Sequence, residues 1–411
     1  MESTICMTAN RLSLARIPQT LHRYPRQLWL LFAGFLINRA SSSMIWPFLT
    51  IYMREQLRAP LSTISLLFTV QAVAGLTATM LIGPAMDRIG RKRIMIVSLL
   101  TTSAILIGMQ AATSLPAWIV LIALYGMSTP IFTVGGNAMV ADVVDDVHQR
   151  TEAYALIRMA QNLGIAIGPA VGGALIVVSY SLTYYLTAFV NVLLAGFIIV
   201  FLTETLGPQL IESLRPPGGY GPLLRDRAFM IFCAIFVLIQ MIVALVFGLL
   251  SVYAKENFGI PENQYGLIVV INAVMVVLFQ YRMTRFTQRF RHLTVMAAGS
   301  LLYALGVVSI ALGSSFAAFA VSMVIITLGE LMVFPTTLAL VAHMAPAGMR
   351  ARYMSIYSLT YTVAMGIAPV FGGFLNDWVA PAAIWYGGML LGLAAALCFL
   401  LLMRTDLISD Q

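Results

Sequence analysis

The sequence predicts an all-α membrane protein with twelve transmembrane helices. Of its 411 residues, 60% are hydrophobic and only 10% are charged, and the mean hydropathy is +0.91. A soluble protein of ordinary composition carries about 25% charged residues. The apolar runs are about 20 residues long, which is the length that an α-helix needs to cross a bilayer.

The apolar runs divide the chain into two halves of six helices. The runs lie at about residues 28–52, 61–82, 94–112 and 117–141, around Gly164–Gly173, and at about 181–202, 228–253, 265–286, 295–313, 317–343, 354–375 and 382–402. The predicted domains are a cytoplasmic tail (1–27), a first six-helix bundle (28–202), a cytoplasmic linker (203–226), a second six-helix bundle (227–403) and a cytoplasmic tail (404–411).

A repeated motif supports this division. Gly168-Pro169-x-x-Gly172-Gly173 recurs as Ala368-Pro369-x-x-Gly372-Gly373, at an offset of 200 residues. Two related six-helix halves are typical of carriers built from internal repeats.

The basic residues set the expected orientation. Of the 24 Lys and Arg residues, 3 fall in loops on one side of the predicted membrane and 2 fall inside helices. The other 19 fall on the opposite side, which is therefore expected to be cytoplasmic together with both termini. This topology accounts for the net charge of +8, so we expect no nucleic-acid partner. The predicted location is the cytoplasmic (inner) membrane.

A densely charged loop follows the second apolar run. Its sequence is Gly83-Pro84-Ala85-Met86-Asp87-Arg88-Ile89-Gly90-Arg91-Lys92-Arg93. We expect a tight turn in which the glycines allow positive φ. Asp87 can pair with one of the neighbouring bases or with a helix end. Asp142 falls at the same membrane face as Arg91, so these two side chains either form an ion pair or leave Asp142 solvated.

The pattern Gly-x-x-x-Asp-Arg-x-Gly-Arg-Lys resembles the loop between helices 2 and 3 of the major facilitator superfamily. Ala85 stands where that family usually has leucine. The resemblance covers residues 28–403 and implies two bundles that expose a central cavity alternately to either side. It also implies a cytoplasmic latch that stabilises the outward-open state, formed by Gly83, Asp87, Arg88, Gly90, Arg91 and Asp142.

The fifth apolar run carries a second motif, Gly164-x-x-x-Gly168-Pro169-x-x-Gly172-Gly173. Small residues at this spacing let helices pack backbone to backbone, and a proline in the helix interior bends it. The full string resembles the antiporter motif of drug-exporting members of the superfamily, which importers typically lack. It therefore implies the drug:proton antiporter branch, the twelve-helix multidrug efflux type.

Polar residues in the first half are candidate site residues. Asn38 and Arg39 lie within the first run, and a central arginine costs about 2.5–3.5 kcal/mol to insert. Arg39 must therefore face protein or a watery cavity, in a structural or a functional role. Arg158, Gln161 and Asn162 share one helical face, which we expect to point inward because lipid would leave them unpaired.

Glu330 is the only acid deep inside a predicted span. A carboxylate is costly there when charged, so we expect it to exchange a proton near physiological pH. The charged form can hold a cationic substrate, and the neutral form can return with a proton. The alternative is a permanently protonated glutamate in a structural hydrogen bond. Gln240 and Asn272 are weaker candidates, because lone amides more often hold membrane helices together.

Two local features near the membrane surface are also predicted. Pro47 is expected to kink the end of the first helix. Tyr180, Tyr184 and Tyr185 are expected to form an interfacial aromatic belt at the start of the sixth run.

These observations predict a proton-coupled secondary transporter that exports hydrophobic, cationic, drug-like small molecules by alternating access. Its expected partners are a small-molecule substrate, protons and the lipid bilayer, and we expect a monomer. The chain has no phosphate-binding loop, no metal-spaced His and Cys set and no nucleophile elbow. We therefore expect no cofactor, no metal and no enzymatic activity.

Three other functions stay open. One is a lipid or glycolipid flippase of the same fold, in which Arg39 and Arg158 hold an anionic head group. Another is an exporter with a narrow specificity for a sugar or a metabolite. The third is a membrane sensor or scaffold that transports nothing, against which the short loops argue.

Overall fold

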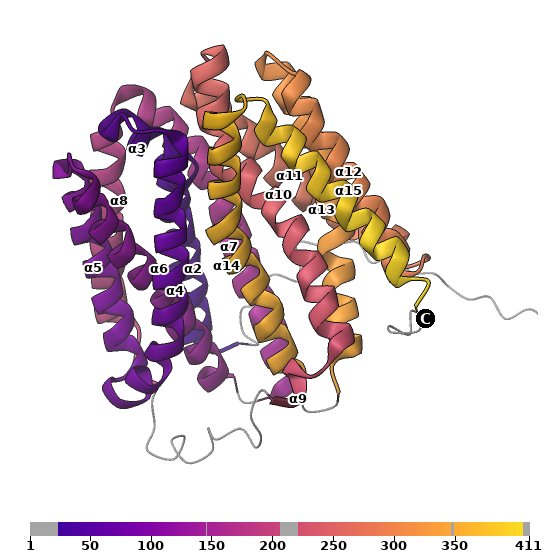
Figure 1. Ribbon diagram of the computed structural model, residues 1–411. Helices are drawn as coiled ribbons and strands as arrows, with labels where there is room; N and C mark the ends of the chain where they lie inside the picture. The colour runs from indigo at the N-terminus through magenta and orange to yellow at the C-terminus, as the bar shows by residue number, and fades with distance from the viewer. Residues whose placement is uncertain (1–23, 145, 206–220, 347–348, 406–411) are drawn as a thin grey trace, which may run out of the picture.

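The structure, a computed structural model, is helical throughout the part of the chain that it describes, residues 24–144, 146–205, 221–346 and 349–405 (Figure 1). Within those residues, twelve segments are long and apolar enough to cross a membrane, which confirms the predicted fold class. In chain order the elements are α2 (Arg26–Ile45), η2 (Trp46–Phe48), α3 (Leu49–Leu57), α4 (Leu61–Ile89), α5 (Arg91–Ala111), α6 (Leu115–Val143), α7 (Val147–Val178), α8 (Tyr180–Phe201), α9 (Gly221–Leu224), α10 (Arg227–Phe258), α11 (Glu262–Thr287), α12 (His292–Leu312), α13 (Phe316–Met344), α14 (Arg350–Trp378) and α15 (Ala383–Leu402). Most of the predicted linker, and the predicted tails except residues 24–27 and 404–405, lie outside the described residues.

The first membrane-spanning segment is interrupted by a proline. α2 ends at Ile45, and residues 46–48 form one turn of 3₁₀-helix around Pro47 before α3 begins. Proline lacks the backbone N–H and clashes with the preceding turn, so the kink predicted at Pro47 is confirmed. Other helix starts are set by side chains, as where Asp226 accepts the Phe229 backbone N–H at the start of α10.

The turn after α4 is shorter than the sequence predicts. The apolar run ends at Ile82, but α4 continues to Ile89, so Gly83 lies inside the helix. The loss of hydrophobicity marks the edge of the membrane, and charged residues such as arginine are good helix formers beyond it. Gly90 alone makes the turn, with φ +104°.

The helices form two bundles that meet in the middle of the molecule (Figure 1). Helices α2–α8 form the first bundle, in which α2 packs on α7 and α4 packs on α6. Helices α10–α15 form the second, in which α12 packs on α13 and α15, and α10 on α14. The bundles touch through α4 against α14 and through α7 against α11. We name the end of the molecule that carries α3 the α3 end, and the opposite end, where α9 lies, the linker end.

The repeated glycine pairs lie at equivalent contacts between the bundles. Gly173 of α7 packs on the first turn of α11, where an added Cβ would lie 2.8 Å from the Glu262 carbonyl oxygen. Gly373 of α14 packs on the first turn of α4, where an added Cβ would lie 2.9 Å from the Leu61 carbonyl oxygen. The 200-residue sequence repeat is therefore a structural repeat, and in both halves it brings one bundle close to the other.

The tyrosines at the start of α8 do not form an aromatic belt. Tyr185 is exposed, but Tyr184 is only 1% exposed and its ring lies 4.8 Å from that of Tyr52. Tyr180 points to the other bundle, where its hydroxyl donates a hydrogen bond to Glu262. Contacts with α3 and with the second bundle, rather than contact with lipid, therefore set the positions of Tyr184 and Tyr180.

Candidate functional site

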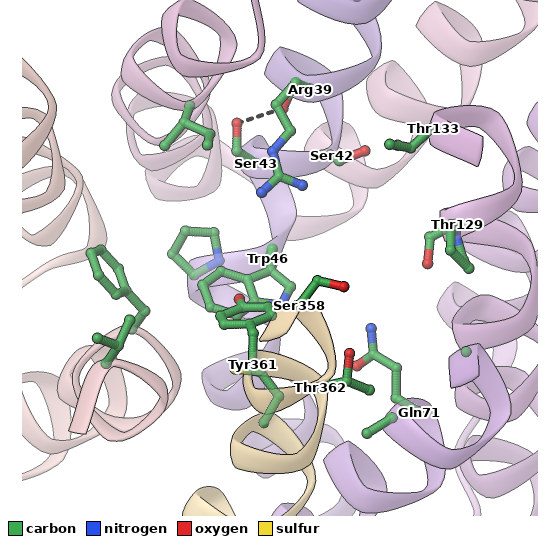
Figure 2. Close-up of a pocket in the computed structure, with 18 of the residues that line it drawn as sticks. Arg39, Ser42, Ser43, Trp46, Gln71, Thr129, Thr133, Ser358, Tyr361 and Thr362 are labelled. Carbon is green, nitrogen blue, oxygen red and sulfur yellow. Dashed lines mark hydrogen bonds between the residues drawn. The ribbon is translucent and has the colours of Figure 1, made fainter. Parts of the chain in front are cut away.

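A cavity of about 720 Å³ lies between the two bundles. Helices α2, α4, α6 and α7 line it from the first bundle, and α10, α11, α13 and α14 line it from the second. Cavities of a few hundred to a thousand cubic ångströms suit small-molecule ligands. Figure 2 shows part of the wall, which includes the polar side chains of Arg39, Gln71 and Thr129 and the ring of Trp46.

The structure separates the polar residues predicted in the first half. Asn38, Arg39 and Asn162 line the cavity. Arg158 and Gln161 are not part of its wall, although they precede Asn162 on α7. Arg158 is exposed and Gln161 is partly buried. The cavity therefore begins one turn along α7 from Arg158, nearer the α3 end.

Glu330 lines the cavity from α13 and remains partly exposed to it. Its Oε2 accepts a hydrogen bond of 2.6 Å from Nδ2 of Asn272 on α11. The same Asn272 nitrogen lies 3.0 Å from Thr327 Oγ1, and Asn272 is only 7% exposed. Asn272 is thus fixed by packing and presents an N–H to the carboxylate. Its role as a partner of Glu330 depends on a contact between two helices that the sequence does not reveal.

Gln240 lies away from the cavity. It is 4% exposed, and its Oε1 has no hydrogen-bond partner among the residues that the structure describes. It is therefore a buried amide of α10 rather than a residue of the cavity wall.

Sequence reasoning missed several neutral residues of the wall. Gln71 of α4, Tyr125 of α6, and Tyr361 and Thr362 of α14 all line the cavity. Gln71 is the lone amide in its apolar run, which is a usable sequence indication. The tyrosines and the threonine carry none, because such residues occur on every face of membrane helices. In the described residues no group of three or more His, Cys, Asp or Glu side chains is placed to hold a metal ion.

The charged loop at the linker end is held by buried ionic contacts. The Arg91 guanidinium forms an ion pair with Asp142 and donates to the Ala138 carbonyl at 2.8 Å, and both charged side chains are 5% exposed. Thr205 Oγ1 donates to Asp142 at 2.7 Å. Glu204 accepts the Arg91 backbone N–H at 3.1 Å and so caps the start of α5. Asp142 is therefore paired and not solvated.

The other members of the predicted latch are placed differently. Arg88 is exposed, and Gly90 supplies the left-handed turn. An added Cβ at Gly90 would lie 2.5 Å from a Glu204 carboxylate oxygen, so glycine is needed there for conformation and for space. The side chain of Asp87 and the surroundings of Gly83 lie outside the described part of the chain.

The glycine stripe of α7 packs against α2. An added Cβ at Gly164 would lie 2.8 Å from the Ala40 nitrogen, and one at Gly168 would lie 2.5 Å from the Ala40 carbonyl oxygen. One turn further, Gly172 lies against the backbone of Met44. Pro169, on the neighbouring face, lines the cavity. The small residues thus let two helices of the first bundle touch backbone to backbone.

Polar contacts join the two bundles at the α3 end. The pairs are Arg54 with Glu256 at 2.6 Å, Glu55 with Lys255 at 2.5 Å, Tyr180 with Glu262 at 2.5 Å, the Ser62 backbone N–H with Asp377 at 2.7 Å, and Thr50 with the Gly248 carbonyl at 2.7 Å. Aromatic packing of Phe48 on Tyr265 adds an apolar contact. The cavity is therefore covered at the α3 end by contacts between halves that are far apart in sequence.

Comparison with known sequences identifies relatives among transporters. The family model of the Major Facilitator Superfamily matches residues 31–255 and 232–408. A "Na(+), Li(+), K(+)/H(+) antiporter" of Planococcus maritimus is 26% identical over 88% of this chain and 90% of its own length. The "Quinolone resistance protein NorA" of Staphylococcus aureus is 21% identical over 88% of this chain and 92% of its own.

Comparison with solved structures gives the same fold. The nucleoside transporter NupG has a TM-score of 0.75 at 13% identity, covering 93% of this chain and 100% of its own. A POT family transporter in complex with a thioalcohol-conjugated peptide has a TM-score of 0.74 at 17% identity, covering 92% of this chain and 96% of its own. The family match spans nearly the whole chain, and eight of the described helices line a cavity of the size that small molecules need. The chain belongs to the major facilitator superfamily and is a multi-pass membrane transporter rather than an enzyme.

Proposed function

We propose that the protein is a proton-coupled antiporter that exports hydrophobic, positively charged small molecules through the central cavity. The two bundles rock about the cavity and open it alternately at the α3 end and at the linker end. Protons entering the cell supply the energy for export, because the proton and the cargo use the same acid in alternation. The protein works as a monomer in the cytoplasmic membrane.

The observation that carries this proposal is the position of Glu330. It is an acid within a membrane span that faces a cavity of ligand size. Among the described residues, its hydrogen-bond partner is the neutral amide of Asn272 and no cation pairs with it. A carboxylate without a fixed counter-ion can be neutralised either by a proton or by a cationic cargo. Competition of these two for one site is sufficient for antiport.

The proposed orientation places the linker end in the cytoplasm. The cations of the charged loop and those of the turn after α11 lie at this end, as the distribution of basic residues in membrane proteins requires. The α3 end, which is covered by contacts between the bundles, then faces outward. In this orientation, the contacts at the α3 end close the cavity to the outside. Opening outward would break those contacts, and the Arg91–Asp142 region with Asp87 would act as the latch of the outward-open state.

The relatives support antiport and drug export without naming the cargo of this chain. The Planococcus maritimus protein carries the name of a cation/proton antiporter, and NorA carries the name of a quinolone resistance protein. The glycine stripe of α7, which resembles the antiporter motif, packs on α2 beside Arg39. These likenesses support the drug:proton antiporter branch over the import branches of the superfamily.

The proposal is tested by transport in proteoliposomes under an imposed pH gradient. The cargo is a fluorescent lipophilic cation, and wild type is compared with Glu330→Gln. Glu152→Gln, which neutralises an exposed acid at the linker end, is the matched control. We expect gradient-driven transport in wild type and in the control. Glu330→Gln should lose the pH-driven component, because an amide cannot release a proton.

Two results would contradict the proposal. Equal gradient-driven transport by wild type and Glu330→Gln would remove the proton site from α13. Transport of the cation that does not respond to the pH gradient in wild type would replace antiport by facilitated diffusion. Asp87→Asn tests the latch separately, since it should lower transport while expression stays normal.

A further inference from the structure

Arg39 is an arginine in the middle of a membrane-spanning helix, and its charge faces the cavity. It lines the cavity from α2 and is exposed to it. The hydrogen bond recorded at this residue joins its backbone carbonyl to the Ser43 hydroxyl, at 2.7 Å. Among the described residues, no carboxylate forms an ion pair with its guanidinium. Figure 2 shows the guanidinium directed into the open space, on the side where Trp46 and Tyr361 lie.

Arg91 differs from Arg39, because its charge is held by partners within the protein. Arg91 is 4% exposed and is held by an ion pair with Asp142 and a bond to the Ala138 carbonyl. That arrangement is what a structural arginine needs in a membrane protein. Among the described residues, neither a carboxylate nor a carbonyl binds the Arg39 guanidinium, so a structural role does not explain it.

The side chains around Arg39 are neutral. Tyr125 and Tyr361 lie within electrostatic range of its charge, and Thr129 and Thr133 extend from α6 toward the same space (Figure 2). Hydroxyl groups can accept single hydrogen bonds, but they do not balance a positive charge. A guanidinium presents a planar fork of donors that matches a carboxylate or a phosphate. The first bundle therefore offers the cavity an anion-binding group.

The second bundle offers the opposite chemistry. Glu330, held by Asn272, provides an acid on the other side of the cavity. Glu330 and Arg39 do not pair with each other in the described structure. Apolar side chains, including Phe68 and Phe247, also line the cavity. A cargo that binds Arg39, Glu330 and the apolar side chains at once has an anionic group, a cationic group and an apolar body.

We propose that the cargo carries an anionic group, a carboxylate or a phosphate, which Arg39 binds. The cargo then carries this anionic group in addition to its positive charge and its apolar body, as an amphipathic zwitterion does. This inference rests on the proposed function only in assuming that the central cavity is the transport site. The anionic group belongs to a soluble small molecule or to a lipid head group, and the test separates these two sources.

The test compares two fluorescent compounds that differ only in a carboxylate. Nε-dansyl-lysine is a zwitterion, and dansylcadaverine is the same molecule without its carboxylate. Binding to purified protein is measured without any gradient, by energy transfer from tryptophan, since Trp46 lies in the cavity wall. The variants are Arg39→Gln, Arg39→Lys and the control Arg289→Gln, which removes an exposed cation from the turn after α11.

We expect wild type and Arg289→Gln to bind Nε-dansyl-lysine at least tenfold more tightly than dansylcadaverine. Arg39→Gln should lose this preference, and Arg39→Lys should keep part of it, because lysine retains the charge without the fork. A second measurement uses only the wild-type protein, so it tests the proposal even if a variant fails to fold. Phenylglyoxal modification of Arg39, mapped by mass spectrometry, should be slowed by Nε-dansyl-lysine and not by dansylcadaverine.

A second arm measures translocation of fluorescent phosphatidylglycerol in proteoliposomes by dithionite bleaching. Arg39-dependent translocation of this lipid assigns the anion to a head group, and Arg39-dependent binding of Nε-dansyl-lysine assigns it to a soluble cargo. The inference is overturned if neither anion depends on Arg39, or if wild type shows no preference for the carboxylate. Pumping of a plain cation together with no carboxylate preference would leave the proposed antiport intact and refute only the anion site.

Discussion

The hydrogen bond from Tyr180 to Glu262 offers a direct test of how the α3 end is held closed. The Tyr180 hydroxyl on α8 of the first bundle donates to Glu262 Oε1 on α11 of the second, at 2.5 Å. Tyr180→Phe removes this bond and keeps the ring, which packs 5.2 Å from the ring of Tyr52. Lys255 continues to bind Glu262, also at 2.5 Å. The substitution therefore removes one contact between the bundles and leaves the rest.

The expected size of the effect follows from the character of this bond. Hydrogen bonds to charged groups contribute about 1.5–3 kcal/mol. Glu262 is only 7% exposed, but Tyr180 is half-buried, so the lower value of about 1.5 kcal/mol applies. A free-energy change of about 1.4 kcal/mol is a factor of ten in an equilibrium constant. Tyr180→Phe should thus raise the ratio of α3-end-open to α3-end-closed protein about tenfold.

Thiol labelling with a reagent applied on the side of the α3 end measures this ratio. A cysteine at Thr362, which lines the cavity, reports opening in a chain whose own cysteines, Cys6, Cys233 and Cys398, are replaced by alanine. While the open state is the minor one, the rate of modification by a membrane-impermeant reagent is proportional to its population. We expect about tenfold faster labelling with Tyr180→Phe.

Tyr185→Phe is the matched control, because Tyr185 lies on the same helix and is 50% exposed. It should label at the wild-type rate. Equal rates for Tyr180→Phe and wild type would refute the reasoning that this bond holds the bundles together. An equal increase in both variants would show a general loosening of α8 instead.

Three further predictions follow from the packing and the polar contacts. Gly164→Ala should destabilise the protein by about 1–3 kcal/mol and lower its thermal unfolding temperature, because the new methyl group meets the backbone of α2. Gly196→Ala is the control and should not lower the unfolding temperature, because an added Cβ there meets nothing within 4 Å. Equal losses in both variants would contradict the packing argument. Asn272→Ala should reduce pH-driven transport about tenfold with normal expression, because Glu330 loses its hydrogen-bond donor at a cost of about 1–1.5 kcal/mol. Gln240→Ala should leave transport unchanged. A loss of transport in Gln240→Ala but not in Asn272→Ala would contradict the assignment of the site. Arg91→Gln should destabilise by about 3–5 kcal/mol, because it leaves a buried aspartate unpaired, and an unchanged unfolding temperature in detergent would show that the pair contributes little.

Much of the candidate site could be predicted because polar residues are rare inside the spans. Arg39 and Glu330 stand out in apolar runs, and both line the cavity. Arg158 stands out equally and yet lies outside the cavity wall. The cost of burying a charge requires only that it reach water or a partner, and a position near a helix end satisfies that requirement as well as a cavity does. Sequence rarity therefore identifies candidates but does not rank them.

The sequence by itself determined the twelve helices, the division into two halves and the membrane setting. These properties depend on the length and hydrophobicity of each run and on a bilayer of fixed thickness, and both act locally along the chain. The tertiary structure alone decided that Asn272 binds Glu330 and that Tyr180 binds Glu262. It also decided that Arg39 faces the cavity with no counter-ion among the residues that the structure describes. Each of these is a relation between separate helices, and its geometry is set by how closely the small residues of neighbouring helices let their backbones approach.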